Sequence, residues 1–258
     1  MATILAAEPP PDFVARRTRE HRFFWGMSVL MTLVVFIGFS RTYFLAGYFQ
    51  AKPLAAPIVH IHAAVFTAWM LLLVAQTSLT ASGRVEIHRR LGIAGIMLAP
   101  LVFVFGLIVA TEMLRRLSTV PGVDSSVIYA VALSEIAGFA VPTFFAFRLR
   151  RRPADHKRLI IIGTAAMMTA GFGRWPIHAL LHRPLPAMLC TFSLLLLVIA
   201  YDLATLRKVH RATALASAWV VGIALAAIGL STTAAWHQLT AAIIAHPCQD
   251  IAFLLCRS

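Results

Sequence analysis

Charged residues are scarce in this sequence of 258 residues, at 13% of the total. That share is about half of the value in ordinary soluble domains, while 60% of the residues are apolar. A soluble protein of this size has too little interior to bury so much apolar surface, whereas a lipid bilayer covers it. The composition therefore excludes a soluble globular protein and makes the lipid bilayer the first expected partner.

Acidic residues are the scarcest charged type, and the formal net charge is +13. The basic residues lie between long apolar runs rather than on one amphipathic face, so we expect no nucleic-acid partner. The first 20 residues contain Pro9, Pro10 and Pro11 and lack the apolar core and cleavage site of a secretory signal. The first apolar run is therefore expected to be an uncleaved anchor.

Several motifs of enzyme and pigment chemistry are also missing. No glycine loop for phosphate binding is present. The three lysines (Lys52, Lys157 and Lys208) lie in predicted loops, which argues against the Schiff base of a retinal protein. The cysteines lack zinc-ligand spacing, and Cys248 and Cys256 are expected to pair only if the tail lies in an oxidising compartment.

Long apolar runs, by contrast, are abundant, and a membrane-spanning helix needs roughly 20 mostly apolar residues. Seven stretches meet or nearly meet this length: Phe23–Leu45, Pro57–Ala81, Leu91–Met113, Ser126–Phe147, Leu159–Leu181, Leu185–Leu206 and Ala212–His237. The sequence predicts an all-α, polytopic membrane helical bundle with seven transmembrane helices. Its expected parts are an N-terminal segment (1–22), the seven-helix domain (23–237) and an interfacial tail (238–258).

The distribution of lysine and arginine among the loops predicts the orientation of this bundle. Sixteen of the 23 basic residues fall before the first run or in the second, fourth and sixth loops. Basic loops stay on the cytoplasmic side. We therefore predict a cytoplasmic N-terminus, an external C-terminus and a bacterial cytoplasmic (inner) membrane location.

Four histidines repeat one pattern on the predicted cytoplasmic side. His21, His88, His156 and His210 each precede a basic residue where a predicted helix enters the membrane. One interpretation is that they anchor the helices at the interface. Alternatively, neutral imidazoles at one depth could ligate a metal or haem, or the N–H and guanidinium groups could hold lipid phosphate.

The remaining candidate ligands lie on the predicted external side. His60 and His62 begin the second run, and His62 shares a helical stripe with Trp69 and Gln76, which favours it as the ligand facing the interior. In the fifth run, Arg174, His178 and His182 recur every four residues. We predict a cofactor site from His62 and His178, with His60 and His182 as further metal candidates; satisfied core histidines are the alternative.

Two charges fall deep in predicted helices, where an unpaired charge costs roughly 2.5–3.5 kcal/mol on insertion scales. These are Glu135 and Arg174, and we predict that they form a structural ion pair. Glu112 is a rival partner for Arg174, and in a haem protein Arg174 could instead face a propionate. Asp202 is interpreted as an interfacial charge near a helix end.

The spacing of these residues is similar to a pattern known from other membrane proteins. His60-x-His62, Trp69, Gln76, His88-Arg-Arg-Leu-Gly and Asp155-His156-Lys-Arg-Leu resemble a group of uncharacterised bacterial multi-pass proteins. More distantly the pattern is similar to small histidine-containing membrane proteins linked to cytochrome oxidase assembly, and to di-haem cytochrome b bundles. The resemblance implies haem b held by an outer pair, His62 and His178, and an inner pair, His88 and His156.

Three classes of function follow from these observations. The first is a redox or electron-transfer membrane protein that binds haem or a transition metal. The second is a non-catalytic accessory or assembly subunit of a respiratory or similar complex, with other membrane subunits as partners. The third is a transporter or an intramembrane enzyme.

Overall fold

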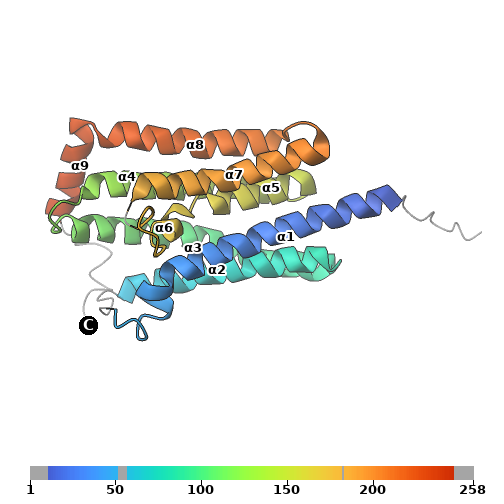
Figure 1. Ribbon diagram of the computed structural model, residues 1–258, viewed down its shortest axis with the longest axis horizontal. Coiled ribbons are helices and arrows are strands. Elements are labelled where there is room, and N and C mark those ends of the chain that lie inside the picture. The colour runs from blue at the N-terminus through green and yellow to red at the C-terminus, as the bar shows by residue number, and fades with distance from the viewer. Residues whose placement is uncertain (1–10, 52–56, 182, 247–258) are drawn as a thin grey trace, which may run out of the picture.

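The structure, a computed structural model, describes residues 11–51, 57–181 and 183–246 and is helical throughout, with no strand in these ranges. Figure 1 shows the helices side by side along one long axis, with α9 lying across one end. The elements are α1 (Pro11–Phe39), the π-helical turn η1 (Ser40–Phe44), α2 (Pro57–Ala81), α3 (Val85–Leu117), α4 (Ser125–Arg148), α5 (Pro153–Ala165), α6 (Thr169–Phe172), α7 (Pro184–Leu206), α8 (Arg211–Ser231) and α9 (Ala234–Ala245).

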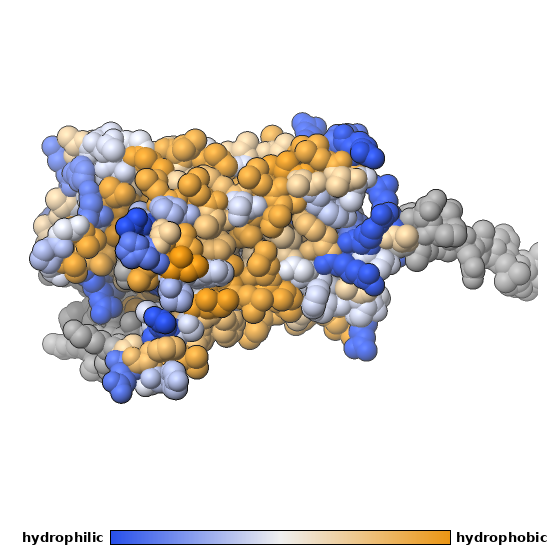
Figure 2. Space-filling model, in the orientation of Figure 1, coloured by the Kyte–Doolittle hydropathy of each residue, from blue (hydrophilic) through white to orange (hydrophobic). Residues whose placement is uncertain are grey.

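Six of these helices are long and apolar enough to cross a membrane: α1 with its π-helical turn, α2, α3, α4, α7 and α8. Their outward surfaces carry large exposed apolar side chains such as Leu189, Leu196 and Leu215. Figure 2 shows a mainly apolar band across the middle of the face in view, with hydrophilic residues gathered at both ends. The protein is therefore a helical, multi-pass integral membrane protein whose long sides contact lipid.

The fifth predicted helix, Leu159–Leu181, is not continuous, and the prediction is wrong in this respect. α5 ends at Ala165, three residues of turn follow, and α6 occupies only Thr169–Phe172. Pro176 cannot extend α6, because proline lacks the backbone N–H and its ring clashes with the carbonyl four residues earlier, here that of Phe172. Figure 1 shows that this broken segment still passes from one end of the bundle towards the other.

The last predicted helix also ends earlier than expected. α8 stops at Ser231, and Thr233 begins α9 by accepting a hydrogen bond from the Trp236 amide (3.2 Å). Trp236 then anchors α9 on α4, since its Nε1 donates to the Ser126 carbonyl (3.0 Å). The predicted tail, 238–258, therefore begins inside α9, while Cys248 and Cys256 lie outside the described residues.

Small residues let α5 and α6 pack at the centre of the bundle, against α1, α4, α7 and α8. A Cβ added to Gly38 would lie 2.2 Å from the Gly171 carbonyl oxygen, and one added to Gly138 would lie 2.9 Å from the Ala166 Cβ. A Cβ on Gly163 would come equally close to the Thr143 hydroxyl. Backbones approach this closely in membranes where glycine removes the side chain.

One end of the bundle holds the turns that join α2 to α3, α4 to α5 and α7 to α8, and we call it the basic end. The basic residues in these turns and in the adjoining helix ends are Arg84, Arg89, Arg90, Arg148, Arg150, Arg151, Arg152, Arg207 and Lys208. Figure 2 shows a rim of hydrophilic residues there. The chain enters α1 at this end, and α9 lies at the other (Figure 1).

Candidate functional site: two buried charge clusters

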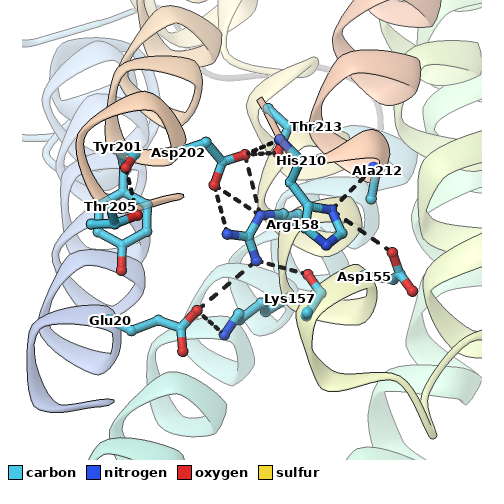
Figure 3. Close-up of polar contacts among 11 residues, drawn as sticks. Glu20, Asp155, Lys157, Arg158, Tyr201, Asp202, Thr205, His210, Ala212 and Thr213 are labelled. Carbon is cyan, nitrogen blue, oxygen red and sulfur yellow. Dashed lines mark hydrogen bonds and ion pairs between the residues drawn. The ribbon is translucent and has the colours of Figure 1, made fainter. Parts of the chain in front are cut away.

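A buried ion pair joins α5 to α7 near the basic end. Arg158 is 1% exposed and Asp202 is fully buried. The guanidinium meets the carboxylate in a forked arrangement, with Nη2 donating to Oδ1 (2.6 Å) and Nε donating to Oδ1 (3.0 Å) and Oδ2 (3.3 Å). Figure 3 shows the two groups facing each other between the helices. This forked geometry is the strongest form of charge-assisted hydrogen bonding.

The remaining bonding capacity of both groups is also used. Asp202 Oδ2 accepts from the Thr213 hydroxyl (2.6 Å) and from the His210 amide (3.1 Å), both at the start of α8. Arg158 Nη1 donates to the Ala154 carbonyl (3.0 Å). Glu20 of α1 contacts Lys157 and approaches Arg158 at 3.9 Å (Figure 3). The cluster therefore ties α1, α5, α7 and α8 together and leaves Asp202 no capacity to bind a ligand.

His210 connects this cluster to the beginning of α8. Its Nδ1 accepts a hydrogen bond from the Ala212 amide (3.2 Å) and lies 3.9 Å from Asp155 Oδ1. Burial, followed by the positive charge of Arg158, lowers the pKa of His210 below its ordinary value of 6.5. A neutral imidazole is the form that can accept the capping hydrogen bond.

The second cluster lies at Glu135, midway along α4. Unlike Asp202, its carboxylate forms no ion pair within 4.0 Å among the described residues. Glu135 lines a small cavity of about 10 Å³, with room for about one water molecule. The other polar residues of the lining are Ser134, Thr169 and Thr191. Glu135 interacts with the Thr169 hydroxyl, and that hydroxyl lies 3.0 Å from the Thr191 hydroxyl. We call this site the Glu135 cavity.

The break between α5 and α6 creates the cavity. The turn there brings Ala166 and Thr169 to the α4 face that carries Glu135, and α7 contributes Thr191. In a continuous helix, the backbone N–H and C=O groups here would form hydrogen bonds within the helix, and only one face of the helix would contact α4. Irregular backbone at membrane depth is found where it is buried in protein or lines a polar cavity.

Arg174 lies close to this cavity without contacting the carboxylate. Its Nη1 donates to the Ala170 carbonyl (2.7 Å), and its guanidinium carbon lies 4.6 Å from the centre of the Phe39 ring. Glu135 and Arg174 interact electrostatically, but no ion pair within 4.0 Å joins them, and none joins Glu112 to Arg174, among the described residues. The structure thus brings the predicted partners into one polar region without a direct contact.

The predicted inner histidines do lie together. The rings of His88 (α3) and His156 (α5) are 6.5 Å apart between centres, and His156 Nδ1 lies 2.9 Å from the Ala146 carbonyl. The side-chain amide of Gln76 has partners for both of its polar atoms in one orientation. Its nitrogen then donates to His88 Nδ1 (2.6 Å) and its oxygen accepts from the Gly92 amide (2.9 Å). His88 also contacts the Gln76 backbone, so Gln76 contacts this histidine through both its side chain and its backbone.

The predicted outer histidines are spread more widely. His62 is half-buried on α2, contacts the Phe105 carbonyl and stacks on Phe66 (6.1 Å between ring centres). His60 and His178 are exposed, and His182 lies outside the described residues. The predicted inward stripe of α2 is confirmed at Trp69, which is buried and donates to Thr164 (3.2 Å).

Within residues 11–51, 57–181 and 183–246, no three His, Cys, Asp or Glu side chains gather closely enough to hold a metal ion. The Arg158–Asp202 pair, in contrast, was missed by sequence reasoning, which interpreted Asp202 as interfacial. The available signal was that Asp202 is the one acidic residue of α7, since a lone charge in an apolar helix requires a partner. Comparisons with protein-family models, curated proteins and solved structures found no match, so the resemblance to histidine-containing membrane proteins stays a prediction.

Proposed function

We propose that the protein is a transporter that moves protons or another small monovalent cation through the membrane, with Glu135 as the group that binds the cation. The observation that carries this proposal is a carboxylate halfway along a membrane helix, in a water-sized cavity, with no ion pair within 4.0 Å in the described part of the chain. Ionisable groups at this depth are expensive and mark ion pathways or proton relays in membrane proteins.

Two further features support the proposal. The first is the broken segment α5–α6, because discontinuous helices near the middle of a membrane form the binding sites of many transporters. The second is the donor set, a carboxylate with three neighbouring hydroxyl groups. Oxygen donors of this kind suit a hydrated proton or a small hard cation. The cavity size limits the cargo to about one water-sized species.

The test is cation flux in vesicles that contain the purified protein. Liposomes loaded with a pH-sensitive dye receive a potassium diffusion potential, and the initial rate of internal pH change is measured. We expect flux above that of empty liposomes, and loss of this flux in Glu135→Gln. Glu86→Gln is the matched control, since Glu86 is exposed and pairs only with Arg90. Equal flux in the wild type and in Glu135→Gln would refute the proposal.

A haem or transition-metal centre is the second candidate, and one observation favours His62 within it. His62 forms a hydrogen bond with the Phe105 backbone, and metal-binding histidines commonly use a backbone carbonyl for orientation. His178 and Arg174 remain the proposed second ligand and propionate partner. Absorption spectra and metal content of the wild type, His62→Ala and His178→Ala test this candidate, and a colourless, metal-free wild type would exclude it.

We also propose that the basic end faces the cytoplasm of a bacterial inner membrane, since short loops rich in arginine stay inside. Reporter fusions after Phe147 and Leu206 are expected to read as cytoplasmic, and fusions after Leu45 as external. An external reading within residues 148–158, which carry six basic residues, would overturn this orientation. Association with other membrane subunits stays a prediction, and copurification from native membranes tests it.

A further inference from the structure

We infer that Arg174 is an internal counter-charge that occupies the Glu135 carboxylate whenever the transported cation has left it. This inference rests on the proposed function and adds the step that resets the site. It begins from the position of Arg174, which follows α6 within irregular backbone rather than within a long helix. The guanidinium is held there by the Ala170 carbonyl and the Phe39 ring.

The contacts that hold Arg174 are weak enough to exchange. A cation over a phenylalanine ring and a single hydrogen bond to a carbonyl are each weaker than a forked pair of bonds to a carboxylate. A contact with an ionised carboxylate at the same depth would offer the guanidinium a forked pair of bonds. In the structure that contact is not made, because no ion pair within 4.0 Å joins Arg174 to Glu135 among the described residues.

The charges around Glu135 leave Arg174 as the one exchange partner among the described residues. Arg174, which follows α6, interacts electrostatically with Glu135, and α7 and α8 contribute hydroxyl and apolar side chains to the cavity. On α2, His62 interacts electrostatically with Arg174. Removing the proton from Glu135 would therefore leave two opposite charges inside the bundle, and their contact would stabilise both.

The exchange conserves charge and protons at each step. When Glu135 releases its proton to one side of the membrane, the carboxylate becomes negative and the guanidinium moves onto it, without losing a proton of its own. When a proton returns from the other side, the carboxyl group becomes neutral and Arg174 goes back to Ala170 and Phe39. No covalent bond forms to Arg174, and no further reactant is required.

The experiment combines flux with labelling of Glu135 by dicyclohexylcarbodiimide, which adds to protonated carboxyl groups in apolar surroundings and forms a stable N-acylurea. The full-length protein in liposomes is labelled at pH 8.5, and the modified peptide is quantified by mass spectrometry. In Arg174→Met the carboxylate loses its counter-charge, so we expect labelling of Glu135 to rise about tenfold, as for one nearby charge, and flux to fall to background. Arg174→Lys keeps the positive charge, so we expect its labelling of Glu135 and its flux to lie between those of the wild type and Arg174→Met.

Two further variants separate this role from simple damage to the fold. Phe39→Leu removes the ring that holds Arg174 away, so labelling should fall about two- to fivefold, the opposite direction, as expected for a cation–π contact. Arg90→Met is the control and should match the wild type, since Arg90 is exposed and pairs with Glu86. Unchanged labelling in both Arg174→Met and Phe39→Leu would overturn the inference even if Glu135→Gln abolishes flux. Wild-type flux in Glu135→Gln would instead refute the proposed function itself.

Discussion

The two charge clusters contain the same pair of chemical groups, one guanidinium and one carboxylate. Arg158 and Asp202 are buried and bonded to each other, whereas Glu135 and Arg174 are half-buried and are not. At the basic end, Asp202 accepts from Arg158, Thr213 and the His210 amide, all within 3.3 Å. Midway along α4, Glu135 shares one region with Arg174 but makes no contact with it within 4.0 Å. The first arrangement has no capacity left to bind anything, whereas the second has a cavity beside it.

The difference shows how the fold divides stability from function. A fully bonded ion pair has no donor or acceptor left for another partner. The Arg158–Asp202 pair therefore acts as a fixed connection between α1, α5, α7 and α8. An incompletely bonded pair has two arrangements of similar free energy, which is the property that a site needs for repeated binding and release. Mutations at the two clusters are therefore expected to separate into losses of stability and losses of activity.

The largest effect on stability is expected from single substitutions at the basic end. Asp202→Asn or Arg158→Met leaves one buried charge without a partner, which costs about 3–5 kcal/mol of unfolding free energy. The double variant should lose less than either single variant, because no charge is stranded. Thermal unfolding in detergent measures this, and equal losses in all three variants would show that the pair is not coupled.

Gly38→Ala is expected to have the next largest effect. The new Cβ would meet the Gly171 carbonyl oxygen at 2.2 Å, so α1 must separate from α6, at a cost of about 1–3 kcal/mol. Gly222→Ala is the matched control, since a Cβ there meets nothing within 4 Å. Similar unfolding temperatures for both variants would contradict the close packing described for the broken segment.

Glu135→Gln is expected to change the unfolding free energy by no more than about 1 kcal/mol, because no ion pair within 4.0 Å is lost. Thermal unfolding in detergent measures this change, and Asp202→Asn is measured in parallel for comparison. A loss as large as that of Asp202→Asn would mean that Glu135 is a structural charge after all. The contrast between the two clusters would then disappear.

The smallest effect is expected from the titration of His210. Because burial lowers its pKa in the folded protein, the unfolded chain binds the proton first as the pH falls. The contribution of His210 to the unfolding free energy is therefore present above pH 6.5 and is lost as the pH falls below it. Protonation also removes the capping hydrogen bond from the Ala212 amide, and we expect a loss of about 1 kcal/mol. His210→Asn keeps a capping side chain without this titration. Its unfolding temperature should fall less than that of the wild type between pH 7.5 and 5.5.

Parts of the candidate site could be predicted from the sequence, and parts could not. Glu135 and Arg174 were recognised because charges are rare in apolar runs, and His88 and His156 because of their repeated spacing. The contact between Gln76 and His88 could not be predicted, since it depends on how far α2 is rotated against α3. For the same reason, a similar depth of His62 and His178 does not show that their side chains face each other. Their shared site stays a prediction.

The sequence by itself determined that the chain is a multi-pass helical membrane protein, because apolar composition and run length respond directly to the bilayer. It also determined some helix boundaries, with α2 and α7 ending as predicted at Ala81 and Leu206, whereas α1 begins at Pro11 rather than Phe23 and α3 at Val85 rather than Leu91. Only the tertiary structure decided that the fifth segment is broken, that α9 turns across the end, and that Asp202 pairs with Arg158. Hydropathy averages over neighbouring residues along the chain, whereas these features depend on which side chains and glycines meet between helices.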